Sequence, residues 1–185
     1  MLTMAYTFAQ MPWCELLIAT GERGLVAVQF VGNEGRQHEV ARLAAHWRGS
    51  ELVESEKENR QAIEELNAYA AGRLCEFTVP LELRGTEFQM SAWRALLEIP
   101  YGETRSYGDL ARAIGHPQAF RAVGMANHSN PIAIIVPCHR VIGSDRRLTG
   151  YGGGLDLKKT LLELERARMA VGPPFPKAQT LPLWE

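Results

Sequence analysis

The residues best suited to covalent chemistry stand together in one short run, Pro137, Cys138, His139 and Arg140. A thiolate is a strong nucleophile, but a free thiol has a pKa of about 8.5 and is mostly protonated at neutral pH. His139 is the obvious base for Cys138. Because adjacent side chains of an extended chain point to opposite sides, we expect a bridging water between them. A carboxylate beyond His139 would orient its ring and stabilise its cation, so the run predicts an activated cysteine nucleophile.

The segment that leads into this run, residues 132–136, is the longest strongly apolar stretch of the chain, and we predict a buried strand there. Pro137 has no backbone N–H and ends the strand, so Cys138 should emerge at the edge of the core. The alternative is that Cys138 is a packed core residue, as a cysteine after a strand more often is, with His139 and Arg140 as surface groups. Both interpretations are open at this point.

A carboxylate and a glycine run lie farther along the chain. Glu165 is on a helix predicted over 155–169, where its default state is a solvated side chain. The run Gly150-Tyr151-Gly152-Gly153-Gly154 is either a flexible loop or a place where the backbone approaches a ligand closely. It lacks the lysine and the spacing of a phosphate-binding P-loop. Neither feature identifies a site by itself.

Two short helices are predicted ahead of the cysteine segment. The first spans 106–114 with Ser106 as its N-cap, Gly115 suits the turn after it, and the second ends near His128. The pair is a helix-turn-helix candidate, although many small domains pack such a pair without binding DNA. Arg121 places a basic side chain on the outward face of the second helix. The residues alone leave two functions open, a cysteine-dependent enzyme and a DNA-binding regulator with an incidental cysteine.

Composition limits the class of protein. The chain has 185 residues, of which 46% are hydrophobic and 22% charged, and these values predict one or two compact domains rather than disorder. Three cysteines leave at least one thiol unpaired and exclude a disulfide scaffold. No apolar stretch approaches the roughly 20 residues of a membrane helix, and the N-terminus lacks a secretory signal pattern. We therefore expect a cytoplasmic protein with no membrane partner.

The net charge of −1 conceals two different halves. A nearly neutral chain would argue against a nucleic-acid partner, because phosphate binding depends on lysine and arginine. Residues 1–90 carry 8 basic and 13 acidic residues, whereas residues 91–185 carry 12 basic and 8 acidic ones. The second half is therefore basic and suited to DNA. Its excess is modest, so we expect few phosphate contacts and a shallow salt dependence.

The acidic half has the pattern of a small α+β unit. Residues 14–20 and 24–31 are β-rich runs separated by a glycine-bounded turn, which is a hairpin signal. Apolar residues repeat at helical spacing over 40–47 and 62–70, and 77–83 returns to a strand-like composition. Two strands, two helices and a further strand are therefore predicted.

The basic half opens with a helix. Thr86 and Gln89 form a capping-box pattern before an apolar face that reaches Ile99, and Pro100 follows it. A proline-rich segment over 171–185 is predicted to be an extended tail.

The run Pro137-Cys138-His139-Arg140-Val141 resembles the acceptor motif of the O6-alkylguanine-DNA alkyltransferase family of DNA repair proteins. The similarity extends in order from about Gly85 to Glu165. It includes Ile99-Pro-Tyr-Gly-Glu-Thr-Arg-Ser-Tyr107, Arg121-Ala-Val-Gly124, Asn130-Pro131 and Gly150-Tyr151. An ordered set of this kind argues strongly against chance. The N-terminal half resembles the family only in its pattern of strands and helices.

The resemblance implies an α+β fold of two domains. Residues 1–84 would form a small ribonuclease-H-like α/β domain. Residues 85–170 would form a mostly helical, winged-helix-like alkyltransferase domain that contains the helix-turn-helix, and residues 171–185 the Pro-rich tail.

The resemblance also implies a reaction, that of a methylated-DNA–protein-cysteine S-methyltransferase. Cys138 would take the alkyl group from O6-alkylguanine, and from O4-alkylthymine, in one in-line displacement. Glu165, His139 and a water would form the activating chain, and Tyr107 would donate a hydrogen bond that helps the base leave as a neutral species. The thioether is inert, so each molecule would act once.

The partner implied is double-stranded DNA. A lesion inside the duplex is out of reach, so the nucleotide would be flipped out while Arg121 enters the stack. The helix-turn-helix would lie in the minor groove, whose contacts carry little sequence information. We expect a monomer, with cooperative assembly along DNA left open.

Four further residues would shape the pocket for the base, according to the resemblance. Asn130 would hold the turn around the cysteine, and Tyr151 would form a wall. The backbone carbonyls of Cys138 and Val141 would accept hydrogen bonds from the guanine amino group. The amide of Gly152 would donate to O6, at a position where many members of the family have serine.

No cofactor and no metal are expected. The cluster of early cysteines and histidines that holds zinc in some members of the family is absent from this sequence. Cys14 and Cys75 lack Cys-x-x-Cys spacing and are predicted to be small apolar residues in strand-like settings. Two other functions compete: a non-catalytic lesion binder, which carries tryptophan at the acceptor position, and a thiol hydrolase, for which no oxyanion hole is identified. Cys138 argues directly against the first.

Overall fold

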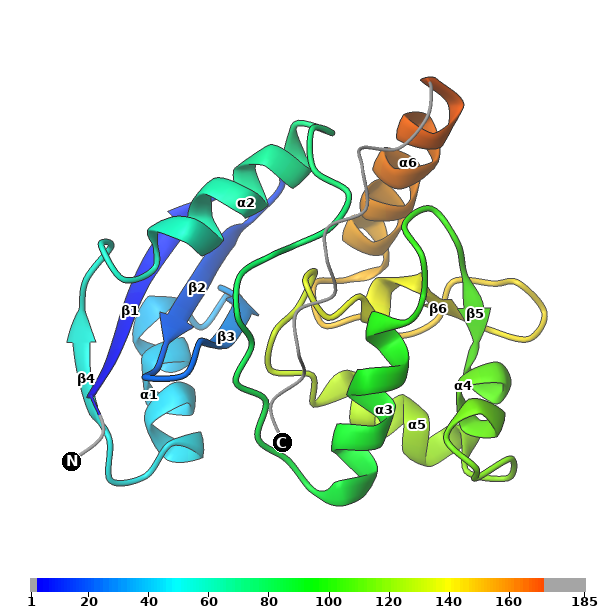
Figure 1. Ribbon diagram of the computed structural model, residues 1–185, viewed down its shortest axis with the longest axis horizontal. Coiled ribbons are helices and arrows are strands. Elements are labelled where there is room, and N and C mark those ends of the chain that lie inside the picture. The colour runs from blue at the N-terminus through cyan, green and yellow to red at the C-terminus, as the bar shows by residue number, and fades with distance from the viewer. Residues whose placement is uncertain (1–2, 172–185) are drawn as a thin grey trace. The chain divides into compact units, whose positions relative to one another are not determined.

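The computed structural model describes residues 3–171, so the tail predicted over 171–185 lies almost wholly outside the described residues. The chain divides into two compact units, one ending at Glu82 and the other spanning Leu83–Ala170 (Figure 1). The first unit contains a sheet with two helices and the second is mostly helical. The α+β fold class is thereby confirmed. No helix in the described part of the chain combines the length and apolar character needed to cross a bilayer.

The first unit is built on a four-stranded sheet in the order β3-β2-β1-β4. Its strands are β1 (Thr3–Gln10), β2 (Glu15–Thr20), β3 (Leu25–Phe30) and β4 (Glu51–Glu54). β1, β2 and β3 pair antiparallel, and β4 joins β1 in parallel. The predicted hairpin is confirmed as β2 and β3. The central strand β1 and the short edge strand β4 had no sequence prediction.

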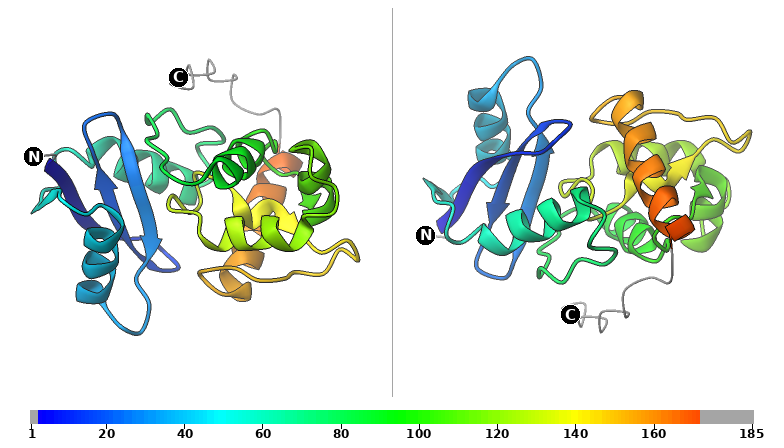
Figure 2. Two further views of the ribbon diagram at one scale, coloured as in Figure 1. Left: turned by 90° about the horizontal axis from the view of Figure 1, so that it is seen from below. Right: turned by 90° about the horizontal axis from the view of Figure 1, so that it is seen from above.

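Two helices pack against this sheet, α1 (Arg36–His46) and α2 (Arg60–Ala70). They lie on opposite faces (Figure 2). On the α1 side, the apolar cluster includes Met4, Leu17, Val26, Leu43 and Trp47, all at most 2% exposed. Alternation along the strands and helical spacing in α1 place these side chains on facing surfaces, as the periodicity predicts.

The strand predicted over 77–83 is wrong. This segment touches β3 at a single bridge between Leu81 and Leu25, where Leu25 N–H donates to the Pro80 carbonyl at 2.7 Å. Pro80 has no N–H to continue a ladder. Gly24 lies so close to Pro80 that a Cβ at this glycine would be 2.4 Å from the Pro80 oxygen. Cys14 and Cys75 are likewise outside the strands, and both thiols are free.

The second unit has four α-helices: α3 (Glu87–Leu97), α4 (Tyr107–Ala113), α5 (Phe120–His128) and α6 (Leu155–Val171). α3, α4 and α5 pack against one another. The predicted capping box of α3, Thr86 with Gln89, is present, and Ser106 caps α4 as predicted. A capping side chain satisfies backbone N–H groups that a helix start leaves unpaired.

The turn between α4 and α5 contains Gly115, as predicted. Its φ of +79° is in the left-handed region that favours glycine. α4 and α5 pack closely, so the helix-turn-helix arrangement is present. Behind α5, the indole Nε1 of Trp93 donates to the carbonyl of Ala126 at 2.8 Å and ties α3 to it.

The buried strand predicted over 132–136 is also wrong. These residues are buried, but they form a tight turn in which Ile134 has φ +71°. The Val136 N–H donates to the Ile132 carbonyl at 3.0 Å, so backbone groups that a strand would offer to a neighbour are used locally. Cys138 then begins a 3-10 helix, η1 (Cys138–Arg140). After it, β6 (Val141–Ile142) pairs in parallel with β5 (Arg105–Ser106).

Candidate active site

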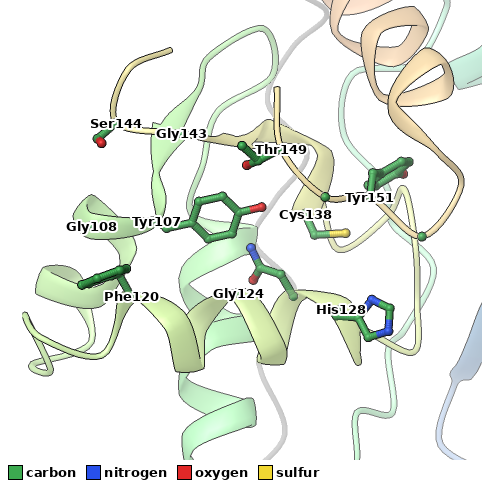
Figure 3. Close-up of a pocket in the computed structure, with 13 residues that line it drawn as sticks. Tyr107, Gly108, Phe120, Gly124, His128, Cys138, Gly143, Ser144, Thr149 and Tyr151 are labelled. Atoms are coloured by element: carbon green, nitrogen blue, oxygen red, sulfur yellow. The ribbon is translucent and has the colours of Figure 1, made fainter. Parts of the chain in front are cut away.

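A pocket of about 570 Å³ opens in the second unit beside η1. Its walls come from α4, α5, η1 and the loop that carries the glycine run (Figure 3). Four residues predicted from sequence line it together, namely Tyr107, Cys138, Tyr151 and Gly152. These residues span 46 positions of the chain, so only the fold brings them into one cavity. The pocket is therefore the candidate ligand site beside Cys138.

Asn130 holds the turn that presents Cys138. Its Nδ2 donates to the Val136 carbonyl at 2.8 Å and to the Cys138 Sγ at 3.3 Å, while its Oδ1 accepts from the Ile132 N–H at 3.0 Å. One side chain therefore closes the turn at both ends and also contacts the sulfur. A carboxamide suits this place because it is donor and acceptor at once.

Cys138 is 8% exposed, and the protonation of its thiol reflects competing influences. Burial raises its pKa, because a thiolate is poorly solvated away from water. The hydrogen bond from Asn130 and the positive charge of Lys158 act in the opposite direction. The site therefore needs a base or a nearby cation to populate the thiolate.

Behind Cys138, three buried side chains form one network. His139 and Glu165 are completely buried, and Nε2 of His139 lies 2.8 Å from Oε1 of Glu165. Arg140 donates to both oxygens of Glu165 at 3.0 to 3.2 Å and to the Ile99 carbonyl at 2.6 Å. The Gly102 N–H donates to Oε2 of Glu165 at 2.9 Å. The interpretation of His139, Arg140 and Glu165 as solvated groups is excluded.

The network determines which groups are ionised. Burial alone would raise the pKa of Glu165, but the hydrogen bond with His139 and the positive charge and hydrogen bonds of Arg140 outweigh it and lower the pKa. Burial lowers the pKa of His139, so the imidazole is neutral near pH 7. A carboxylate accepts hydrogen bonds only, so Nε2 of His139 carries the hydrogen and Nδ1 is the basic nitrogen. His139 is thereby in the form that accepts a proton.

Lys158 is a site residue that the sequence analysis missed. Its side chain is completely buried, and Nζ donates to the carbonyls of Val141 at 2.5 Å, Thr149 at 2.7 Å and Gly150 at 3.4 Å. Burial lowers its pKa to about 8. Its position among the buried residues of α6 was a usable signal, because it stands two turns before Glu165 on the apolar face.

Five predicted site residues lie outside the pocket lining: Asn130, His139 and Glu165, described above, and Val141 and Arg121. Val141 is fully buried, and its carbonyl already accepts from Lys158, with one lone pair remaining for a second donor. Arg121 is exposed on α5, with its guanidinium 5.8 Å from the ring centroid of Phe120, which does line the pocket. In the described part of the chain, no three His, Cys, Asp or Glu side chains converge as a metal site would require.

Comparison with known proteins identifies both units. Residues 4–83 match the family model described as 6-O-methylguanine DNA methyltransferase, ribonuclease-like domain. Residues 87–167 match its DNA binding domain. Fold and site thus define a two-domain protein of the 6-O-methylguanine DNA methyltransferase class.

Individual relatives agree. A methylated-DNA–protein-cysteine methyltransferase of Methanosarcina barkeri is 48% identical over 162 residues, 88% of this chain and 97% of the relative. The Mycobacterium tuberculosis protein of the same name is 66% identical over 107 residues, 58% of this chain, and that match spans only 65% of the relative's length. The crystal structure of M. tuberculosis OGT in complex with DNA matches with TM-score 0.76 and 47% identity, covering 89% of this chain and 94% of the other. The chain belongs to the methylated-DNA–protein-cysteine methyltransferase family.

Proposed function

We propose that this protein repairs alkylated DNA by moving the alkyl group of O6-alkylguanine onto its own Cys138. The observation that carries the proposal is the position of Cys138, whose thiol lines a pocket and is backed by the buried pair His139 and Glu165. This arrangement joins a nucleophile, a neutral base and an orienting carboxylate. Membership of the methyltransferase family supports the same chemistry.

The first step is activation of the thiol. Nδ1 of His139 takes the proton of Cys138 through a bridging water, and the resulting imidazolium is stabilised by Glu165. The network around Glu165 favours this step because the carboxylate stays ionised beside Arg140. The charge of Lys158 also stabilises the thiolate.

The second step is an in-line displacement at the alkyl carbon. The S–C bond forms as the C–O6 bond breaks, and the electron pair of that bond passes to the base. Tyr107 donates a hydrogen bond to the guanine, which takes up one proton and leaves as a neutral species. His139 releases the thiol proton to water and returns to its neutral form, while the guanine takes one proton from water, so the reaction balances. The thioether is inert, and each molecule reacts once.

The same pocket would hold the base through backbone and side-chain groups. The carbonyls of Cys138 and Val141 accept from the guanine amino group, each keeping a lone pair for this beside its internal hydrogen bond. The Gly152 amide donates to O6, and Tyr151 forms a wall. Smaller lesions with a similar edge, such as O4-alkylthymine, fit the same proposal.

Access to a base in duplex DNA requires nucleotide flipping. Arg121 would enter the stack in place of the flipped nucleotide, and its exposure on α5 beside Phe120, which lines the pocket, supports this role. α4 and α5 would lie in the minor groove, and the protein would act as a cytoplasmic monomer. The structure of M. tuberculosis OGT with DNA supports DNA as the partner.

The test is incubation of the chain with a duplex containing one O6-methylguanine, followed by peptide mass analysis. We expect one added methyl group on the peptide that contains Cys138, and none on the peptides with Cys14 or Cys75. A parallel sample with Cys138→Ala should leave the lesion intact. Unmodified protein together with unrepaired DNA would contradict the proposal and favour a lesion binder without catalysis.

A further inference from the structure

One polar side chain in the pocket has no role in the chemistry described above. Asn127 lines the pocket from the last turn of α5 and is 8% exposed. Neither its Oδ1 nor its Nδ2 has a hydrogen-bond partner within the described part of the chain. Folded proteins pair nearly all buried polar groups, since an unpaired amide costs free energy. The unpaired amide therefore indicates that a ligand bound in the pocket supplies its hydrogen-bond partner.

The surroundings of Asn127 leave space for such a partner. Gly124, one turn earlier on α5, also lines the pocket, and a Cβ placed there would still be 3.9 Å from the ring of Tyr107. Because Gly124 has no side chain, the pocket-facing side of α5 next to Asn127 is open. Val123 and Ala126, by contrast, are buried in the core. Asn127 thus stands at the boundary between the packed side of the helix and the cavity.

We infer that Nδ2 of Asn127 donates a hydrogen bond to a ring nitrogen of the flipped base, which makes Asn127 a specificity-determining residue. This inference rests on the proposed function. The ring nitrogens N1, N3 and N7 of O6-alkylguanine are all acceptors, because alkylation at O6 removes the hydrogen from N1. Its one donor, the amino group at N2, is directed to backbone carbonyls. A donor is therefore what the base requires from Asn127.

The amide also explains why a carboxamide, rather than an apolar side chain, stands at this position. An apolar residue would bind the alkyl group and the ring face but would not distinguish between rings with and without a nitrogen acceptor. A site built to hydrogen-bond its ligand rejects an analogue that lacks the bonding atom, because the buried protein group is then left unpaired.

The experiment pairs variants of Asn127 with analogues of a free-base substrate. The rate of benzyl transfer to Cys138 is measured with O6-benzylguanine and with its 1-deaza, 3-deaza and 7-deaza forms, each lacking one ring acceptor. Asn127→Leu removes both polar atoms, and Asn127→Asp keeps the shape but removes the donor. Met125→Ala, at a residue of α5 that is 67% exposed, is the matched control. Free bases make the measurement independent of DNA binding.

We expect both variants to react about 10-fold or more slowly than the unchanged protein with O6-benzylguanine, whereas Met125→Ala reacts at the original rate. With one of the deaza analogues, the unchanged protein should also transfer the benzyl group about 10-fold or more slowly than it does with O6-benzylguanine. Asn127→Leu should transfer from this analogue no more slowly than it does from O6-benzylguanine, because its hydrogen bond is already lost. The nitrogen missing from that analogue is then the one that Asn127 binds. The role of Asn127 would be overturned if each of the three analogues lowered the transfer rate by the same factor in the unchanged protein and in Asn127→Leu. Full activity of Asn127→Asp with O6-benzylguanine would overturn it too. No transfer by the unchanged protein would instead contradict the proposed function.

Discussion

The ammonium group of Lys158 lies 2.5 Å from the carbonyl oxygen of Val141, three residues after Cys138. The same group also donates to the carbonyls of Thr149 and Gly150, two residues that line the pocket. One buried cation therefore joins the segment of Cys138 to the glycine loop. It also places a positive charge near the thiol, which gives the site a second means of stabilising a thiolate.

Replacing Lys158 by methionine should affect the pH dependence of the reaction. The pKa of Lys158 is lowered to about 8 by burial, so the group is still mostly charged at pH 7. Without that charge the pKa of Cys138, already raised by burial, rises further. We expect the pH of half-maximal benzyl transfer from O6-benzylguanine to Cys138 to move upward in Lys158→Met. Lys159→Met, at an exposed neighbour, should leave the profile unchanged, and an unshifted profile in Lys158→Met would exclude the electrostatic role.

Glu165→Gln should destabilise the protein strongly. The substitution leaves Arg140 buried without its carboxylate, and removing one partner of a buried ion pair costs about 3–5 kcal/mol. It also ends the control of the His139 tautomer, so transfer to Cys138 should slow in the fraction that remains folded. Urea unfolding and single-turnover rates measure the two effects. Glu163→Gln, two residues earlier and exposed, is the control.

The lowered pKa of Glu165 also predicts a loss of stability in acid. The folded-state pKa lies below the ordinary value of 4.5, so this group stabilises the fold fully above pH 4.5 and loses its contribution as the pH falls toward the folded-state value. We expect the urea midpoint to fall between pH 6 and pH 3 by more in the unchanged protein than in Glu165→Gln. Parallel declines in the two proteins would show that other carboxyl groups account for the effect.

Asn130→Ala should loosen the turn and make Cys138 harder to ionise. The substitution removes the hydrogen bonds to the Val136 carbonyl and the Ile132 N–H, which predicts a loss of about 1–3 kcal/mol in unfolding free energy. It also removes the hydrogen bond to Sγ, one of the influences that lower the thiol pKa. Alkylation of Cys138 by iodoacetamide can be followed by peptide mass analysis across a pH series. The pH at which half of Cys138 is alkylated in a fixed time should therefore be higher in Asn130→Ala. An unshifted series would limit Asn130 to a structural role.

Arg121→Ala should separate DNA recognition from chemistry. Arg121 is exposed on α5 and does not line the pocket, so transfer from free O6-benzylguanine should continue at nearly the original rate. Repair of O6-methylguanine in duplex DNA should fall by about 10-fold or more if this side chain replaces the flipped nucleotide. Arg23→Ala, which removes an exposed arginine of the first unit, controls for the loss of one positive charge. Equal losses on both substrates would refute the flipping role.

Local patterns in the sequence predicted much of the second unit. Capping boxes involve residues three positions apart, so Thr86 with Gln89 and the start of α4 at Ser106 could be identified directly. The apolar spacing of α6 predicted its start at Leu155. The motif around Cys138, with the ordered motifs on either side of it, was sufficient to predict the family and the pocket residues Tyr107, Tyr151 and Gly152.

Other features depended on contacts between distant parts of the chain. The apolar composition of 132–136 predicts burial but does not distinguish a strand from a turn, because the choice depends on which backbone groups find partners. The four-residue strand β4 was missed for a related reason, since a short strand is stabilised by its neighbour in the sheet.

The sequence by itself thus determined the proposed nucleophile, its proposed neighbouring base and the helices around them, because those signals are local. Only the tertiary structure decided that Arg140 and Lys158 are buried, since each charge is compensated by groups far away in the chain, at Ile99 and Glu165 for Arg140 and at Val141 and Thr149 for Lys158. Burying a charge is costly without such partners. The unpaired amide of Asn127 likewise became visible only when the pocket around it was complete.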